Sequence, residues 1–482
     1  MNKTHFKKEG VRGLLYLMFF IAVQYYTPAI IHSSFFLILL VFIYQSKNDE
    51  FWIPLLMIML SAPGYLFYSR GVYHLPVIGL NAEKGIKYNE LVIIVLLLKS
   101  FKNYFKISFF YKKGIFYIFL YTFILWFIGI YYGMSFMKIF FTIRYLLPFS
   151  LFWSVPALIN TREKIYKSLN LIFIFALFSF AMQLIDLIAG NPLSGFLGES
   201  KIIESFTSRE VDLNNTKIFN VNQETVRTIY SVFILTIAFL SSAYLLLINS
   251  KVFNRKYLSV VLILTLLSVF LSATRGWIIA YVLVLFGMYI IKPKQIKYFW
   301  VGLMLITILY IFIPSVRFQV SNVFERLTTL ESLAKGDVSA NGTLSRLSVR
   351  GPKVMKKYAE SPVLGFGYSM DYYEYADGHV GNQNLLLNSG VVGLSIYLIF
   401  LIYSIYYIYQ KGKLVNKSLW IWIFGLLALL IIHSSSRQIF AYYFDFNTAI
   451  GLSSIFYLVD FFTKEQILIN QKQTSSINNN KE

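Results

Sequence analysis

Long apolar runs separated by short polar segments repeat along almost the whole chain. Runs of about 17–25 apolar residues are long enough to cross a bilayer as helices. They lie near residues 12–27, 29–44, 51–68, 88–99, 115–132, 136–157, 167–189, 223–248, 257–273, 275–291, 298–314, 386–409, 418–434 and 440–462. We predict an all-α polytopic integral membrane protein with about 12–14 transmembrane helices, because the first four runs are short or close-set.

One long polar segment, residues 315–385, interrupts this pattern and leads directly into the next apolar run. It follows a transmembrane bundle of about eleven spans (1–314) and precedes C-terminal transmembrane helices (386–462) and a tail (463–482). Within the loop, Pro352 predicts a short helix over residues 353–360, Leu364–Gly367 predicts a tight turn, and the tyrosines of Tyr368–Tyr375 suit a membrane interface. We expect this long extracytoplasmic loop with short helices to carry the function of the chain at one face of the membrane.

The composition agrees with a membrane protein. Hydrophobic residues make up 57% of the 482 residues and charged residues 14%, with a mean hydropathy of +0.60. The net charge is +21, but the lysines form short clusters between apolar runs, so no nucleic-acid partner is expected. The absence of cysteine excludes disulfides, thiolate metal sites and cysteine nucleophiles.

The distribution of lysine and arginine predicts the topology. Basic clusters fall on alternate connecting segments, and the positive-inside rule then places both termini in the cytoplasm. Residues 190–222 and the loop 315–385 fall on the outside. The basic stub Met1–Arg12 leads into a span without a cleavage site and is interpreted as a signal anchor. The Asn- and Ser-rich tail is predicted to be a disordered cytoplasmic segment.

Several arginines lie within or at the outer ends of predicted helices: Arg144, Arg227, Arg275 and Arg437. A charge near mid-membrane costs about 2.5–3.5 kcal/mol on insertion scales, so each needs a partner or a ligand. Candidate partners are Glu224 for Arg227, Asp186 for Arg144 and Asp445 for Arg437. Arg275 stands among small residues that permit close approach of a ligand, but a solvated turn residue would look the same.

The loop carries its own cations: Arg317, Arg326, Arg346, Arg350, Lys353, Lys356 and Lys357. They either bind an anionic ligand, for which guanidinium–phosphate pairing is well suited, or lie on anionic lipid headgroups. His379 lies just before the next helix, and an imidazole can accept a proton from a hydroxyl near neutral pH. By itself a single loop histidine is more often an ordinary surface residue.

Motifs for nucleotide, zinc and metal–nucleotide-sugar binding (Gly-x-x-x-x-Gly-Lys, His-Glu-x-x-His and Asp-x-Asp) are missing from the sequence. We therefore expect neither a metal nor a cofactor.

Two stretches of the chain carry a family resemblance. One is the junction Ser272–Gly276, with small residues and Arg275 at the outer end of a helix. The other contains, in order, Arg346, Pro362, Gly365, Gly367, His379, Gly390 and Gly393. This order resembles the bacterial O-antigen ligase / O-antigen polymerase superfamily of envelope glycosyltransferases over about residues 260–410. The chain departs from the family pattern at Val380, where the family has Asn, and at Arg350, where it has Trp.

The resemblance implies a metal-independent enzyme that transfers a glycan from undecaprenyl diphosphate to an acceptor hydroxyl. By position, Arg275 and Arg346 would hold the diphosphate, and His379 would act as general base. We add Arg326 and Arg317 to the diphosphate-binding residues on charge alone. A positioned base typically accelerates a reaction about 10²–10⁴-fold, and cations that stabilise the leaving group are expected to contribute a larger share of the acceleration. Expected partners are the undecaprenyl-diphosphate-linked oligosaccharide, membrane lipids and, as a further candidate, a chain-length regulator, in the bacterial inner membrane.

Three functions stay open at this point. The first is a polymerase that joins lipid-linked repeat units into O-antigen or capsular polysaccharide. The second is the ligase that moves finished polymer onto lipid A core. The third, from another class, is a lipid-linked oligosaccharide flippase, which would need charged residues along a central cavity rather than a long outer loop.

Overall fold

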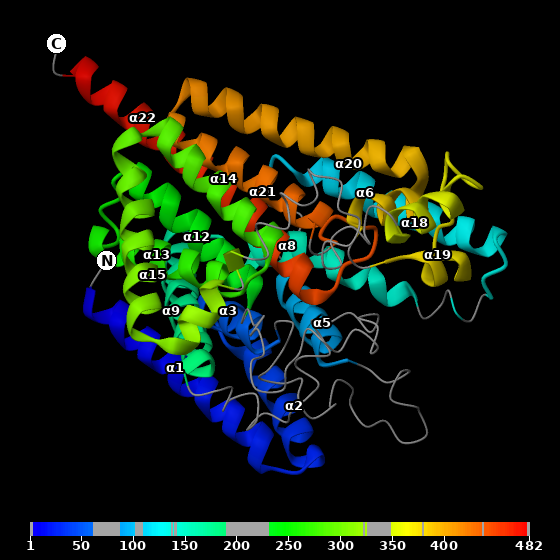
Figure 1. The fold of residues 1–482 in the computed structure, drawn as a ribbon, viewed down its shortest axis with the longest axis horizontal. Coiled ribbons are helices and arrows are strands. Elements are labelled where there is room, and N and C mark those ends of the chain that lie inside the picture. The colour runs from blue at the N-terminus through cyan, green and yellow to red at the C-terminus, as the bar shows by residue number, and fades with distance from the viewer. Residues whose placement is uncertain are drawn as a thin grey trace.

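The fold is known from a computed structural model, which describes residues 3–60, 87–101, 109–135, 138, 142–188, 231–321, 323–324, 349–377, 380–435 and 438–479. Within these ranges the chain forms helices joined by turns, and no strand occurs (Figure 1). The expected all-α class is confirmed to this extent, and the structure is compatible with a polytopic membrane protein.

The helices and their bounds are α1 (Lys3–Tyr26), α2 (Ala29–Gln45), α3 (Asp49–Met59), α5 (Tyr88–Ser100), α6 (Lys112–Tyr131), η2 (Ile143–Tyr145), η3 (Leu147–Ser150), α8 (Leu151–Leu158), α9 (Arg162–Ile188), α12 (Val232–Leu247), α13 (Arg255–Leu271), α14 (Arg275–Ile291), η5 (Pro293–Ile296), α15 (Lys297–Phe312), α18 (Gly351–Tyr358), α19 (Met370–Tyr375), α20 (Gly381–Leu414), η7 (Lys417–Trp420), α21 (Ile421–Ser435) and α22 (Phe446–Asn479).

Six helical stretches in the described ranges are long and apolar enough to cross a membrane: Lys112–Tyr131, Arg162–Ile185, Pro293–Phe312, Gly381–Leu414, Lys417–Ser435 and Phe446–Gln471. Shorter apolar helices are Ser33–Gln45, Leu147–Leu158, Val232–Leu247 and Arg275–Ile291. A total of 12–14 spans, and the side on which each terminus lies, stay predictions.

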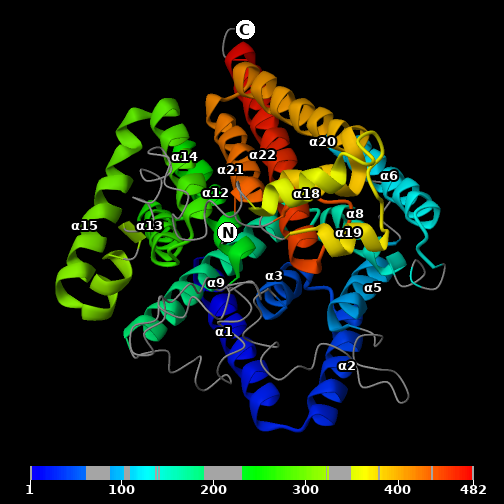
Figure 2. The ribbon, with the colours of Figure 1, turned by 45° about the vertical axis from the view of Figure 1, so that its right-hand side comes forward.

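The centre of the bundle is α22, and α15 lies at its edge. Of the apolar stretch of α22, 94% is buried inside the protein, against 22% for that of α15. Figure 2 shows α15 on the outside of the bundle and α1 and α2 together at another edge. Exposed apolar side chains on α15, such as Trp300, Met304 and Phe312, form a surface suited to lipid.

Two predicted segments differ from the structure. The run 136–157 is not one helix, because η2, η3 and α8 divide it. Pro148 is the second residue of η3, and Pro156 lies inside α8, where its ring removes a helical hydrogen bond. The tail 463–482, expected to be disordered, continues α22 to Asn479. Glu465 explains the order of its first part, since this buried carboxylate accepts hydrogen bonds from Arg162 and Tyr166 at 2.5 and 2.8 Å.

In the described part of the loop, α18 spans Gly351–Tyr358, where we predicted a helix over 353–360, and Gly365 and Gly367 of the predicted turn have positive φ angles of 68° and 55°. The turn that contains these glycines docks on α20, where Gly390 has non-helical angles of φ 62° and ψ −170°. A helix break leaves backbone groups unpaired. Residues 362–367 supply new hydrogen-bond partners for the backbone on both sides of the break. The loop is therefore fixed to a spanning helix by backbone hydrogen bonds.

Candidate functional site

One face of the bundle is formed by residues 349–377 of the loop, the beginning of α20 and the end of α21. We call it the loop face. Figure 1 shows α18 and α19 side by side there, next to α6 and the beginning of α20. The backbone of Tyr368 donates to the carbonyl of Leu125 near the end of α6, at 3.3 Å. The side chain of Asn382 donates to Ser434 at the end of α21, at 2.9 Å. Candidate site residues are placed relative to this face.

Of the predicted site residues, the structure describes Arg275 and Arg317. His379, Arg326 and Arg346 lie outside the described residues, as do Arg227 and Arg437.

Arg275 is the first residue of α14, at a tight junction with α13. Ala273 has a positive φ of 54°, and Ser272 and Ala273 are buried. The helices α14 and α21 run side by side in opposite directions (Figure 1), with Gly287 packed against the ring of Phe424. From this contact, both Arg275 and Ser435 lie about 16–18 Å toward the loop face. Arg275 is therefore level with the end of α21.

Arg317 lies after the end of α15 and folds back on it. Its guanidinium donates to the carbonyl of Ile311 at 3.1 Å and to that of Tyr310 at 3.4 Å, and it stacks on the Tyr310 ring at 5.7 Å. The last carbonyls of a helix lack helical hydrogen-bond partners, and a cation there also interacts favourably with the negative end of the helix dipole. The observed contacts of Arg317 are thus those of a helix cap.

The residues that flank positions 378–379 are held by several contacts. The side chain of Asn384, which is buried, accepts a hydrogen bond from the amide of Asp377 at 2.9 Å and donates to its carbonyl. Arg350 lies 3.6 Å from the carboxylate of Asp377. On the other flank, Gly381 packs so closely on the carbonyl of His433 that a Cβ atom would lie 2.0 Å away. One flank is therefore held by Asn384 and Arg350, and the other rests on the end of α21.

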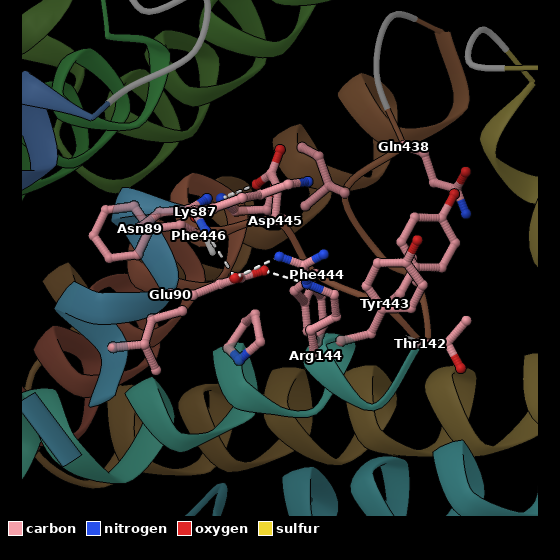
Figure 3. Close-up of a pocket in the computed structure, with 16 residues that line it drawn as sticks. Lys87, Asn89, Glu90, Thr142, Arg144, Gln438, Tyr443, Phe444, Asp445 and Phe446 are labelled. Atoms are coloured by element: carbon pink, nitrogen blue, oxygen red, sulfur yellow. Dashed lines mark hydrogen bonds and ion pairs between the residues drawn. The ribbon is translucent and has the colours of Figure 1, made fainter. Parts of the chain in front are cut away.

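A cavity of about 440 Å³ lies on the loop face between α5, η2 and residues 438–448 (Figure 3). Its lining is mixed in chemistry: Lys87, Asn89, Glu90, Ile93, Thr142, Arg144, Tyr145, Pro148, Gln438, Ile439, Ala441, Tyr443, Phe444, Asp445, Phe446 and Thr448. The volume falls in the range of about 300–1,000 Å³ that is usual for small-molecule sites.

Glu90 and Arg144 face each other in this cavity. Nε and Nη2 of Arg144 each lie 2.6 Å from a carboxylate oxygen of Glu90, and the amide of Lys87 donates to the same carboxylate at 3.0 Å. The two side chains are 14% and 19% exposed, so a bidentate pair of this kind is strong. Glu90 is therefore the carboxylate that pairs with Arg144, where we had expected Asp186, whose side chain lies outside the described residues.

Tyrosines of the loop extend this polar wall. The hydroxyls of Tyr372 and Tyr443 lie 2.8 Å apart, and Tyr145 packs on Tyr443 and Tyr368. Burial raises the pKa of Tyr372 well above its ordinary value. We predicted that Tyr368–Tyr375 rests at the membrane interface, but Tyr368 and Tyr372 are buried inside the protein because they cover the cavity-lining segment.

A second cavity, of about 680 Å³ and almost wholly apolar, lies between α13, α14, α15 and residues 320–324. We call it the apolar groove. Ile278, one turn after Arg275, lines it, and so does Tyr310, on which Arg317 stacks. Gln319 ties the segment after α15 to the end of α13, donating to the carbonyl of Leu271 at 2.5 Å. Two residues that line the groove are therefore close to the predicted cations Arg275 and Arg317.

Sequence reasoning missed Glu90, Asn384 and Gln438. Glu90 left a signal, because a carboxylate near the start of an apolar run needs a partner just as an arginine does. The sequence contains no comparable signal for Asn384 and Gln438, since isolated amide side chains are common near helix ends.

The chain matches no protein-family model, and no curated protein matches it significantly.

Proposed function

We propose that this chain is a polysaccharide polymerase of the bacterial inner membrane. It would transfer a glycan from undecaprenyl diphosphate to a hydroxyl of an acceptor sugar and build O-antigen or capsule. Both termini would then be cytoplasmic and the loop face extracytoplasmic, in agreement with the positive-inside pattern.

The observation that carries this proposal is the position of Arg275 at the end of the apolar groove. An isoprenoid chain needs an apolar path at membrane depth, and its diphosphate needs cations at the surface. The groove offers the first over about 680 Å³, and Arg275, one turn from the lining residue Ile278, offers the second. A guanidinium pairs with phosphate oxygens in two parallel hydrogen bonds, which makes arginine the fitting residue.

In the proposed reaction, His379 accepts the proton of an acceptor hydroxyl while the hydroxyl oxygen attacks the anomeric carbon of the donor. The bond between this carbon and the diphosphate oxygen breaks, and undecaprenyl diphosphate leaves with the bonding electrons. Arg275, together with Arg346 and Arg326, would balance the charge on the leaving group. Arg317 is the weakest member of this set, because its contacts with the carbonyls of Tyr310 and Ile311 already explain its presence.

Complementation of a strain deleted for this gene tests the proposal. Wild type is compared with His379→Ala and Arg275→Ala at matched membrane levels, and surface polysaccharide is resolved on a gel. Arg255→Ala is the matched control, because Arg255 also begins a helix, α13, and is exposed. We expect a ladder for wild type and Arg255→Ala, and single-repeat product for the other two.

Each alternative gives a different result. Long polymer that accumulates on the lipid carrier without reaching lipid A would indicate a ligase. Lipid-linked single units trapped on the cytoplasmic side would indicate a flippase. Normal polymer from His379→Ala would show that the general-base assignment is wrong.

A further inference from the structure

The charges that line the Glu90–Arg144 cavity balance. Lys87 and Arg144 provide two cations, and Glu90 and Asp445 two carboxylates. A diphosphate is attracted by a surplus of cations, which this lining does not have. A neutral ligand with many hydroxyls instead needs donors and acceptors in equal supply. The balance therefore favours a sugar over the diphosphate of the donor.

Two polar atoms in the lining have unmet hydrogen-bonding capacity. Among the described residues, neither Oδ1 of Asn89 nor Nε2 of Gln438 has a hydrogen-bond partner, although both atoms are buried. A buried polar atom without a partner costs about 1–3 kcal/mol. One is an acceptor and the other a donor, so a single hydroxyl-bearing ligand in the cavity could satisfy both.

The walls of the cavity suit the flat faces of sugar rings. Tyr145, Tyr443 and Phe444 line it with aromatic rings, and tyrosine combines an apolar face with a polar hydroxyl. Ligand sites typically combine such apolar walls with a few placed polar groups.

Gln438 connects this cavity to the flank of His379. Its Oε1 accepts a hydrogen bond from Asn384 at 3.2 Å, and Asn384 in turn holds Asp377. The amide of Gln438 thus has one end in the cavity and the other on the segment that carries the proposed base. An acceptor hydroxyl has to reach that base, whereas the far end of the donor lipid does not.

We propose that the cavity between α5, η2 and residues 438–448 is the binding site for the acceptor sugar. Asn89 and Gln438 bind its hydroxyls, and the Glu90–Arg144 pair fixes the wall beside them. This assignment rests on the proposed glycosyl-transfer function and separates the acceptor site from the donor site at Arg275 and the apolar groove.

Binding of a defined probe tests the site without requiring turnover. The probe is a two-repeat oligosaccharide cut from the surface polysaccharide of the producing strain, without its lipid. It is titrated calorimetrically into the full-length chain in nanodiscs. We expect Asn89→Leu and Gln438→Leu each to weaken binding about tenfold, the equivalent of one lost hydrogen bond of about 1.4 kcal/mol.

Gln295→Leu is the matched control. Gln295 is also a buried glutamine whose amide atoms have no partner in the described ranges, but it lies in η5, away from the cavity. The Gln295→Leu protein should bind the oligosaccharide as tightly as wild type. Thermal unfolding of all three variants reports whether each is folded. Two variants on different elements guard against the loss of one through misfolding.

The outcomes separate this inference from the proposed function. Folded Asn89→Leu and Gln438→Leu proteins that bind the oligosaccharide like wild type, in a chain that restores polymer in cells, overturn the acceptor site alone. A chain that neither binds oligosaccharide nor restores polymer overturns both. Displacement of the oligosaccharide by an equal concentration of inorganic pyrophosphate would show an anion site instead and also overturn the assignment.

Discussion

Gly365 and Gly390 pack backbone against backbone, and a Cβ atom on Gly365 would lie 2.6 Å from the amide nitrogen of Gly390. At this point the turn of the loop takes over the hydrogen bonds that α20 gives up. The amides of Phe366 and Gly367 donate to the carbonyls of Leu387 and Asn388, both at 2.8 Å. In return, the amides of Val391 and Val392 donate to the carbonyls of Pro362 and Val363, at 2.9 and 3.2 Å. The glycines of the Pro-x-x-Gly-x-Gly stretch and of α20 are thus parts of one joint.

Gly390→Ala should undo this joint. A Cβ atom there would lie 2.1 Å from the carbonyl oxygen of Val363, and the φ and ψ angles are accessible essentially to glycine alone. We expect a loss of at least about 1–3 kcal/mol in stability and faster proteolysis within the loop. Gly133→Ala is the control, because Gly133 also has a positive φ, of 79°, but nothing lies within 4 Å. Equal effects of the two changes would show that backbone strain alone, and not docking, is responsible.

Asn384→Leu should loosen the segment that carries His379. Asn384 is 1% exposed, and its side chain holds both backbone groups of Asp377. Leaving these buried groups unpaired costs about 1–3 kcal/mol, so we expect strongly reduced polymer and a lower unfolding temperature. Asn382→Ala serves for comparison, since Asn382 is exposed and makes one side-chain bond, to Ser434, among the described residues. Full activity in folded Asn384→Leu protein would contradict a positioning role.

The docking of α18 should weaken in alkali. Nζ of Lys357 lies 2.7 Å from Glu360 and 3.0 Å from Asp371, and it stacks on the Phe366 ring at 4.8 Å. Its hydrogen bond to Glu360, supported by Asp371, raises the pKa of Lys357. A raised pKa in the folded state means that the contribution is complete below the unfolded pKa of about 10.4 and is lost as the pH rises through the folded pKa.

We therefore expect proteolysis of the loop in wild type to speed up as the pH rises above about 10.4. Lys357→Met should be cleaved faster at pH 8 and should change less over the same interval. If the proteolysis rates of the two proteins rose with pH in parallel, Lys357 would not be the titrating group. The buried tyrosines of the loop would then be the remaining candidates.

The Glu90–Arg144 pair should behave as one unit. Removing one partner of this partly buried pair takes away two charge-assisted hydrogen bonds, so Glu90→Gln and Arg144→Gln should each cost about 1.5–3 kcal/mol. The double variant should cost less than the sum, with a coupling of about 0.5–3 kcal/mol in chemical unfolding. Glu163→Gln is the control, because Glu163 is 65% exposed and its bond to Lys167 should contribute less than about 1 kcal/mol. Additive effects at Glu90 and Arg144 would contradict the pairing.

Local patterns predicted some elements well. The apolar run 275–291 lies between polar residues on both sides, and α14 has these bounds. Pro352 and the glycines at 365 and 367 also marked the short helix and the turn of the loop, because their backbone preferences act within a few residues.

Tertiary relationships were beyond such patterns. Arg144 pairs with a residue 54 positions away, and only the packing of η2 on α5 decides that its partner is Glu90. The tail was expected to be disordered from its composition, which says nothing of the contact between Glu465 and Arg162. The predicted roles of His379, Arg346 and Arg326 remain predictions, since these residues lie outside the described ranges.

The break at Gly390 also predicts how deep the chain would sit in a bilayer. With 34 residues α20 is about 51 Å long, well beyond the roughly 30 Å of a hydrocarbon core. Its exposed large apolar side chains begin at Val391, and none occurs from 381 to 389. We therefore expect the headgroup boundary to lie at the joint between loop and helix. A thicker or thinner membrane would change the tilt of α20 below Gly390, while the loop keeps its height above the lipid surface.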